Sequence, residues 1–286
     1  MGKRIKIPIK SETEIRKMRI AGEIASEVLQ ATAGFIEPGR TTAEVDAYAA
    51  ELIAERGGTP TFLGYRDFPA NICISINEEV VHGIGGSRRI QPGDLISIDI
   101  GVTMDGWIGD NAVTVPVGPI TQEDRRLLAA TEQSLYEAID HARDGVLLAD
   151  LCGSVEAYVN RHGFTVVRKL VGHGVGRNLH EKPEVPNFRP EGRAPRLKAG
   201  MILAIEPMVN AGVGEVDWLD DGWTVVTADR KSSAHFEHTV LVTTGDPEIL
   251  TSRPRTALPE HLGGTLYPDG LEVAVLLSCD PGQVCA

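Results

Sequence analysis

The chain has 286 residues, of which 42% are hydrophobic and 24% charged, a balance typical of a soluble globular protein. Its formal net charge of −12 argues against nucleic-acid binding, DNA included, because such proteins need a basic surface. No apolar run approaches the ~20 residues that a membrane-spanning helix needs, and the four cysteines form no CxxC pair, so we expect a cytoplasmic protein with reduced thiols.

Two capping boxes predict the first two helices. Ser11 is followed three residues later by Glu14, and Thr41 stands in the same relation to Glu44. In a capping box the hydroxyl and the carboxylate each accept a backbone N–H at the start of the helix. Apolar residues at helical spacing follow each box, and Gly or Pro-Gly pairs come after them. We therefore expect two helices before residue 58.

Further elements follow along the chain. Residues 72–76 alternate between isoleucine and smaller side chains, a pattern that predicts a strand. Helices are expected near 121–142 and 149–162. The pattern weakens beyond residue 242, and we therefore predict one catalytic domain over 1–250 and a tail or small hairpin over 251–286.

The most informative feature is an internal echo. Residues 93–99 (GDLISID) and 200–206 (GMILAIE) each place an acid at the same distance from a glycine, after a short apolar strand. Each segment is preceded by a histidine in a glycine-rich turn and followed by another acid. These flanking residues are His82 and Asp110 in the first case and His173 and Glu237 in the second. The repeated order predicts two related halves with a site between them.

The acids of the echo point to metal binding. An ionised carboxylate in an apolar strand is costly unless it is paired or bound to metal, and no matching Lys or Arg adjoins Asp99 or Glu206. A buried salt bridge would explain one such acid, but two at matching offsets favour a shared metal site. With Asp110, His173 and Glu237 the set is four carboxylates and an imidazole, which suits Mn, Fe, Co or Zn. Their combined charge predicts two divalent ions, sharing a water that attacks a carbonyl.

Five segments together resemble the type I methionine aminopeptidases. They are NEEVVHG at 77–83, DIGVTMDGWIGD at 99–110, GHGVGRNLHEKP at 172–183, GMILAIEPMVN at 200–210 and FEHTVLVT at 236–243. The similarity runs in order over about residues 10–245. It implies an α+β pita-bread fold, with two pseudo-symmetric halves, a central antiparallel sheet and helices outside. It also implies an enzyme that removes the initiator methionine from nascent polypeptide N-termini.

The resemblance assigns roles to individual residues. It makes Asp99, Asp110, His173, Glu206 and Glu237 the metal ligands, Glu206 also the proton shuttle, and His82 and His180 the residues that contact the substrate. It places Phe62, Tyr65, Phe68, Cys73 and Trp223 around the methionine side chain, and Leu179 at the same pocket, near the second substrate residue. Core packing is the competing interpretation of the phenylalanines. Leu179 stands where many bacterial members carry an aromatic residue, and Phe62 where a cysteine is common.

There are two alternatives: a related peptidase with another specificity, and a binding protein, which belongs to a different functional class. A proline-directed relative, such as a prolidase, usually carries a sizeable N-terminal domain, whereas only some tens of residues precede the pattern here. A binding protein of the same fold would be expected to have lost metal ligands. All five candidate ligands, four carboxylates and one imidazole, are present here. We expect a monomer, and the sequence leaves transient contact with the ribosome open.

Overall fold

The computed structural model of the chain describes residues 7–253. The predicted tail or small hairpin lies, beyond residue 253, outside the described residues. The predicted boundary at 250/251 therefore stays a prediction, although residues 251–253 continue to contact the rest of the fold.

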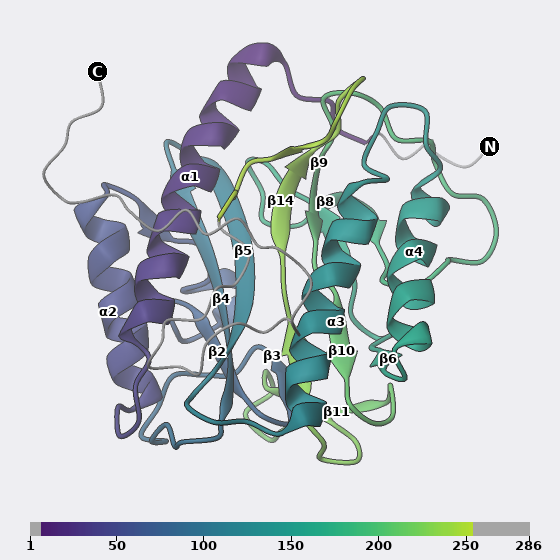
Figure 1. Cartoon of the computed structure of the whole chain (residues 1–286). Helices are drawn as coiled ribbons and strands as arrows, with labels where there is room; N and C mark the ends of the chain where they lie inside the picture. Colours follow the sequence, from purple (N-terminus) through teal and green to yellow (C-terminus); the bar gives the residue numbers. More distant parts are fainter. Residues whose placement is uncertain (1–6, 254–286) are drawn as a thin grey trace, which may run out of the picture.

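Both predicted capping boxes are present. Ser11 caps α1 (Glu12–Phe35), and its hydroxyl and backbone exchange hydrogen bonds with Glu14. Thr41 and Glu44 do the same for α2 (Thr42–Glu55). The two helices lie side by side over the strands of the first half (Figure 1). The sequence signals at the helix starts thus position the outer layer of that half.

A second helix pair covers the other half. Helix α3 (Gln122–Ile139) begins at the expected Thr121, whose hydroxyl accepts the backbone N–H of Asp124. Helix α4 (Leu148–Arg161) starts without a side-chain cap. Figure 1 shows both on the opposite side of the molecule from α1 and α2, with the strands between the two pairs.

The strands of the first half form one antiparallel sheet. Its order is β1-β4-β2, and β5 pairs with β4 over ten residues. The strands are β1 (Thr59–Pro60), β2 (Cys73–Ile76), β4 (Leu95–Met104) and β5 (Trp107–Pro116). The predicted strand at 72–76 is β2. A short 3-10 helix, η1 (Tyr65–Asp67), lies between β1 and β2.

The second half contains a five-stranded antiparallel sheet of order β15-β14-β9-β7-β8. Its strands are β7 (Gly172–Gly174), β8 (Glu181–Val185), β9 (Ile202–Ile205), β14 (His238–Leu241) and β15 (Glu248–Ile249). The echo is thus realised in space, because β4 and β9 carry the two related sequences and each pairs with a later strand, β5 or β14.

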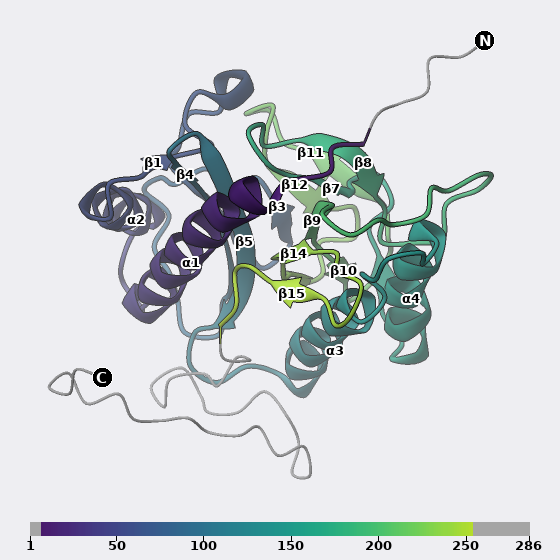
Figure 2. The ribbon, with the colours of Figure 1, turned by 90° about the horizontal axis from the view of Figure 1, so that it is seen from above.

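Two small antiparallel sheets complete the described fold. One has the order β13-β10-β6, formed by β6 (Thr165–Val166), β10 (Met208–Asn210) and β13 (Ser233–His235). The other has the order β11-β12-β3, formed by β3 (Glu79–Val81), β11 (Val216–Trp218) and β12 (Val225–Thr227). Figure 2 shows β3 and β10 near the centre of the molecule.

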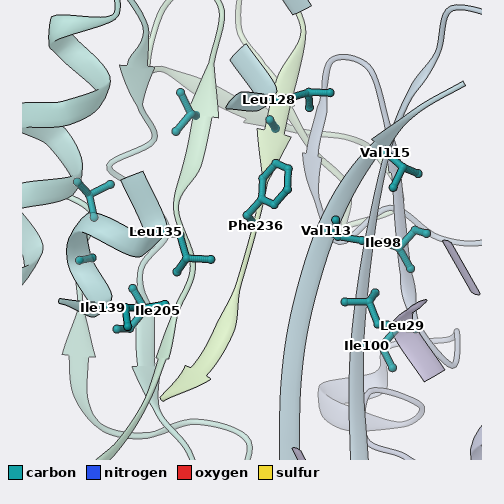
Figure 3. Packing of buried hydrophobic residues seen from close by; sticks show 14 of the residues in the cluster. Leu29, Ile98, Ile100, Val113, Val115, Leu128, Leu135, Ile139, Ile205 and Phe236 are labelled. Carbon is teal, nitrogen blue, oxygen red and sulfur yellow. The ribbon is translucent and has the colours of Figure 1, made fainter. Parts of the chain in front are cut away.

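One hydrophobic core continues from the first half into the second. Phe236 is fully buried and lies between Leu135 of α3 and Val113 of β5 (Figure 3). Burial of a phenylalanine side chain stabilises a fold by about 1.5–3 kcal/mol. The ring therefore fixes the position of the neighbouring residue in the chain, Glu237. None of the helices within residues 7–253 is long and apolar enough to cross a membrane.

Candidate metal centre and active site

Asp99 and Asp110 come from the two long strands of the first half. Asp99 on β4 pairs with Ala112, and Asp110 on β5 pairs with Gly101. Residues two apart on a strand share a face, so both carboxylates point to the same side of the sheet. The sequence predicts that each acid lies near a strand. The register of β4 and β5 adds that the two acids are diagonal neighbours on adjacent strands.

Three further candidates come from the second half. His173 on β7 pairs with Ala204 on β9, so Glu206, two residues further along, shares the face of His173. His238 on β14 pairs with Ile205, and extending this register by one residue places Glu237 opposite Glu206. The pleat and register of three strands therefore bring the imidazole and both glutamates together.

All thirteen residues predicted from the sequence line one cavity of about 230 Å³. From the first half these are Phe62, Tyr65, Phe68, Cys73, His82, Asp99 and Asp110, and from the second His173, Leu179, His180, Glu206, Trp223 and Glu237. The polar and the apolar candidates thus share a single cavity between the two halves.

The acids and the imidazole make a compact cluster at this cavity. Ligand atoms of Asp110, His173 and Glu237 lie within 4.8 Å of one another. Nε2 of His173 is 3.8 Å from Oδ2 of Asp110 and 3.5 Å from Oε1 of Glu206. Asp99 lines the same cavity but contributes no atom to this tightest group.

Burial and mutual repulsion determine the pKa values in the cluster. Burial raises the pKa of Asp110 to about 7, and burial together with the neighbouring carboxylates raises the pKa of Asp99, Glu206 and Glu237 well above their usual values. Burial lowers the pKa of His173 to about 3. Four carboxylates without a cation repel one another in a medium of low dielectric constant.

Several polar atoms of the cluster are buried without a hydrogen-bond partner among the described residues: Oδ1 of Asp99, Oδ1 of Asp110 and Oε1 of Glu237. Leaving such an oxygen unpaired is costly. Nδ1 of His173 lies 2.9 Å from the carbonyl oxygen of Gly174, which fits a proton on Nδ1 and a free lone pair on Nε2. Unpaired oxygens and an oriented imidazole fit a divalent cation as the missing partner.

Two glycines allow the neighbouring strands to approach His173. A Cβ at Gly172 would lie 2.4 Å from the carbonyl oxygen of Ala204, and one at Gly174 would lie 2.4 Å from that of Lys182. Only glycine leaves room for backbone this close. The GHG sequence therefore serves packing on both sides of β7.

His180 and His82 stand apart from the acids. Nδ1 of His180 lies 2.6 Å from the Tyr65 hydroxyl, and its ring centroid is 4.2 Å from that of His173. His82 has a φ of 60°, which is uncommon for a residue other than glycine, and its ring meets Trp223 edge-on. Burial lowers the pKa of His82 to about 4, so this side chain is neutral at pH 7.

The apolar part of the cavity is built from packed side chains. Phe62, Phe68, Cys73 and Leu179 are each at most 7% exposed, and the Phe68 ring meets Trp223 edge-on. Core packing and cavity lining, which competed as interpretations of the phenylalanines, therefore both hold. Burial raises the pKa of the Cys73 thiol well above its usual value, so it serves as packing and not as a nucleophile.

Three residues near the site were not predicted from the sequence. Arg66 and Leu170 line the cavity, and Nε2 of the buried His235 lies 3.8 Å from Oε2 of Glu206. The position of Arg66 beside Tyr65 was the available signal. His235 stands two residues before Glu237, but a lone histidine is more often structural, and only the fold reveals its proximity to Glu206.

Comparison with known proteins gives consistent matches. The model of metallopeptidase family M24 matches residues 16–244. A methionine aminopeptidase from Clostridium perfringens is 50% identical over 245 residues, which cover 86% of this chain and 98% of that protein. The crystal structure of methionine aminopeptidase from Thermotoga maritima superposes with a TM-score of 0.85 at 40% identity, covering 87% of this chain and 100% of that one.

More distant structures share the fold alone. A prolidase from Pyrococcus horikoshii superposes with a TM-score of 0.70 at 24% identity, and the match covers 86% of this chain but 64% of the prolidase. The expected pita-bread architecture is confirmed by these neighbours. Membership of a metallopeptidase family also implies the use of divalent metal, in keeping with the unpaired oxygens of the cluster.

Proposed function

The chain belongs to metallopeptidase family M24, and we propose that it removes the N-terminal methionine from peptides and newly made proteins. One observation carries the proposal: four carboxylates and one imidazole from both halves converge on a cavity that also has an apolar pocket. The 50% identity to a methionine aminopeptidase, over 98% of that protein, supports the choice of substrate.

We infer that Asp99, Asp110, His173, Glu206 and Glu237 hold two divalent ions. The four carboxylates, when ionised, balance the charge of two such cations, and three of their oxygens have no hydrogen-bond partner within residues 7–253. Oxygen and nitrogen donors without thiolate suit Co, Mn, Fe or Zn. Bound ions would supply the positive charge that polarises the scissile carbonyl and lowers the pKa of a water molecule.

The side chains around the cluster have separate tasks. If the Tyr65 hydroxyl donates to Nδ1 of His180, the proton of that imidazole lies on Nε2, ready to donate to the carbonyl oxygen as negative charge develops. Glu206 accepts the proton of the attacking water and returns it to the leaving amine. His82, which lines the same cavity, contacts the substrate.

The apolar residues of the cavity select the side chain of the first substrate residue. Methionine is unbranched and polarisable, so it fits a pocket of aromatic and sulfur-containing residues and gains favourable contacts with the rings. Phe62, Phe68 and Trp223 supply the rings, and Cys73 supplies the sulfur. A charged or short side chain would lose these contacts.

The expected substrate is the free N-terminus of a nascent chain, encountered in the cytoplasm by a monomeric enzyme. A cavity of about 230 Å³ has room for the first residues of an extended N-terminus but not for a folded segment. Transient contact with the ribosome is part of this proposal, and co-sedimentation with ribosomes would test it separately from catalysis. Size-exclusion chromatography would test the monomer.

Release of free methionine tests the function directly. The protein would be stripped with a chelator, reloaded separately with Co²⁺, Mn²⁺, Fe²⁺ or Zn²⁺, and assayed on Met-Ala-Ser and on an Xaa-Pro dipeptide. We expect hydrolysis of Met-Ala-Ser by at least one loaded form and little hydrolysis of the proline substrate. Cleavage of Xaa-Pro alone would reassign the enzyme to a proline-directed activity. A form that binds metal but cleaves neither peptide would indicate a binding protein.

A further inference from the structure

Beside the metal cluster, the backbones of β5 and of the residue before β14 pair at one isolated position. Ala112 of β5 and Glu237, just before β14, form an isolated antiparallel bridge. The N–H of Glu237 donates to the Ala112 carbonyl at 2.9 Å, and the return bond is long, at 3.4 Å. An isolated bridge has no neighbouring ladder to reinforce it, so its geometry needs other support.

Arg253 caps both carbonyls of this bridge. Its Nη2 donates to the carbonyl oxygen of Ala112 at 2.7 Å, and its Nη1 donates to that of Glu237 at 3.3 Å. Nη1 also lies 3.3 Å from Nδ1 of His238. A planar guanidinium has donors in a fixed fork, so one side chain can bind two acceptors in a set relative position.

The segment that carries Arg253 is itself fixed. Thr251 is buried, and its hydroxyl accepts the backbone N–H of Thr239 at 3.0 Å. The Ser252 carbonyl accepts a hydrogen bond from Ser26 of α1 at 2.8 Å. The end of the described chain therefore runs alongside β5, as Figure 2 shows, and is held by both halves.

Thr239, which is held by Thr251, also binds the backbone of Asp110, the carboxylate that lies close to Glu237 in the cluster. The Thr239 hydroxyl donates to the carbonyl of Asp110 at 2.7 Å and accepts its N–H at 3.1 Å. Asp110 stands two residues before Ala112 on β5, and Glu237 is the other member of the bridge. Movement at the bridge would therefore change the separation of the Asp110 and Glu237 side chains, whose oxygens lie within the 4.8 Å cluster.

From these contacts we propose that Arg253 is a positioning residue: it clamps the Ala112–Glu237 bridge and so sets the spacing of Asp110 and Glu237 for a divalent cation. The inference rests on the proposed function, because it takes these two acids to be metal ligands. Arg253 touches neither substrate nor metal in this assignment. Its effect passes through the backbone of β5 and β14.

The test uses full-length Arg253→Gln and Arg253→Lys, stripped of metal and titrated with Co²⁺. Substituting a residue that orients a metal ligand typically weakens metal binding about 10- to 100-fold. We expect the dissociation constant for Co²⁺ to rise by about 10-fold or more in both variants, with a changed visible absorption spectrum of the bound ion. Lysine keeps the charge but lacks the fork that caps both carbonyls.

Arg143→Gln is the matched control. Arg143 also donates to two backbone carbonyls, those of Asp140 at 2.9 Å and Gly245 at 3.3 Å, and does not line the cavity. Its loss should leave Co²⁺ affinity and spectrum unchanged. Thermal unfolding of the metal-free forms separates folding from metal binding.

The outcomes distinguish the clamp from simpler roles. Normal Co²⁺ affinity and spectrum in Arg253→Gln, even with a lower melting temperature, would overturn the proposal. Full recovery in Arg253→Lys would also overturn it, because charge alone would then suffice. If Arg253→Gln does not fold, the lysine variant decides. Failure of the unsubstituted protein to bind Co²⁺ would instead refute the proposed function.

Discussion

The Tyr65 hydroxyl lies 2.6 Å from Nδ1 of His180, although 115 residues separate the two in sequence. Tyr65 belongs to η1 in the first half, whereas His180 immediately precedes β8 in the second. The contact therefore joins the two halves at the cavity. It fixes the ring orientation of His180 and, through the tautomer, what Nε2 offers to a substrate.

Tyr65→Phe should lower kcat by about 5- to 10-fold, since a hydrogen bond of this kind contributes about 1 kcal/mol. His180→Ala should lower kcat by about 10²-fold or more, because it removes the oxyanion donor itself. Both variants should keep their metal. The measurement is steady-state kinetics on Met-Ala-Ser with a metal count.

Tyr48→Phe is the control for the hydroxyl. Tyr48 stacks on Phe35 in the helix layer, away from the cavity, so its substitution should leave kcat unchanged. Loss of metal from His180→Ala would contradict the assignment by making this residue a ligand. An unaltered kcat in Tyr65→Phe would mean that the hydroxyl does not orient the imidazole.

Asp99→Asn and Glu237→Gln should each abolish peptidase activity and leave the protein folded. Each substitution keeps the size of the side chain but removes a charge that offsets the bound cations. The stripped variants should be at least as stable as the stripped parent, because one of four mutually repelling carboxylates is gone. Circular dichroism, thermal unfolding and a metal count make the comparison.

Asp246→Asn serves as the control, because this carboxylate is on the surface, with 91% of its side chain exposed. It should retain activity and metal. Full activity with unchanged metal content in either Asp99→Asn or Glu237→Gln would refute the set of five ligands.

Removing the metal should destabilise the protein more as the pH rises. In the metal-free form burial raises the pKa of Asp110 to about 7, above its value in an unfolded chain. A group with a raised pKa stabilises the fold at low pH, and that contribution is lost as pH rises through the folded-state pKa. Bound cations have the opposite pH dependence: they stabilise the fold more as pH rises, because they bind only deprotonated ligands. The melting temperature of the loaded protein minus that of the stripped protein should therefore grow from about pH 5 to about pH 8.

Subtracting the melting temperature of the stripped protein cancels the pH dependence of groups that are not ligands. His82, whose pKa burial lowers to about 4, should destabilise both forms as pH falls below its unfolded value. Differential scanning fluorimetry over the pH series measures both curves. A difference that is constant or shrinks with pH would mean that the cluster does not bind the cation through these acids.

Local sequence signals predicted the elements well. Ser11 and Thr41 predicted two helix starts, because a capping box acts within four residues. The echo of 93–99 and 200–206 predicted that the acids converge, because related halves pair their strands alike. Such features depend on residues that are close together in the sequence, so the sequence alone is enough to predict them.

Contacts between distant segments were beyond such signals. Nothing near Arg253 in sequence indicates that it caps the bridge of Ala112 and Glu237, and the predicted domain boundary at 250/251 falls two residues before it. The approach of Tyr65 to His180 likewise depends on how the halves close. Periodicity specifies which face of an element is buried, and not which distant side chain meets it.

Leu179 should control which residue is accepted after methionine. Its side chain is 6% exposed and lines the cavity next to His180 in sequence. A phenylalanine buries more area and leaves less room, so Leu179→Phe should discriminate more strongly against a branched second residue. A difference of one methylene in such a pocket is worth ~1–3 kcal/mol, large enough to appear in kcat/KM.

The quantity to measure is kcat/KM for Met-Val-Ser divided by that for Met-Ala-Ser. We expect this ratio to fall in Leu179→Phe because the added ring removes space that valine needs and alanine does not. Leu63→Phe makes the same chemical change at a side chain that is 53% exposed on the surface, and it should leave the ratio alone. A ratio that stays constant or rises in Leu179→Phe would show that the second substrate residue lies elsewhere in the cavity. Arg66, exposed on the same cavity wall, would then be the next position to substitute.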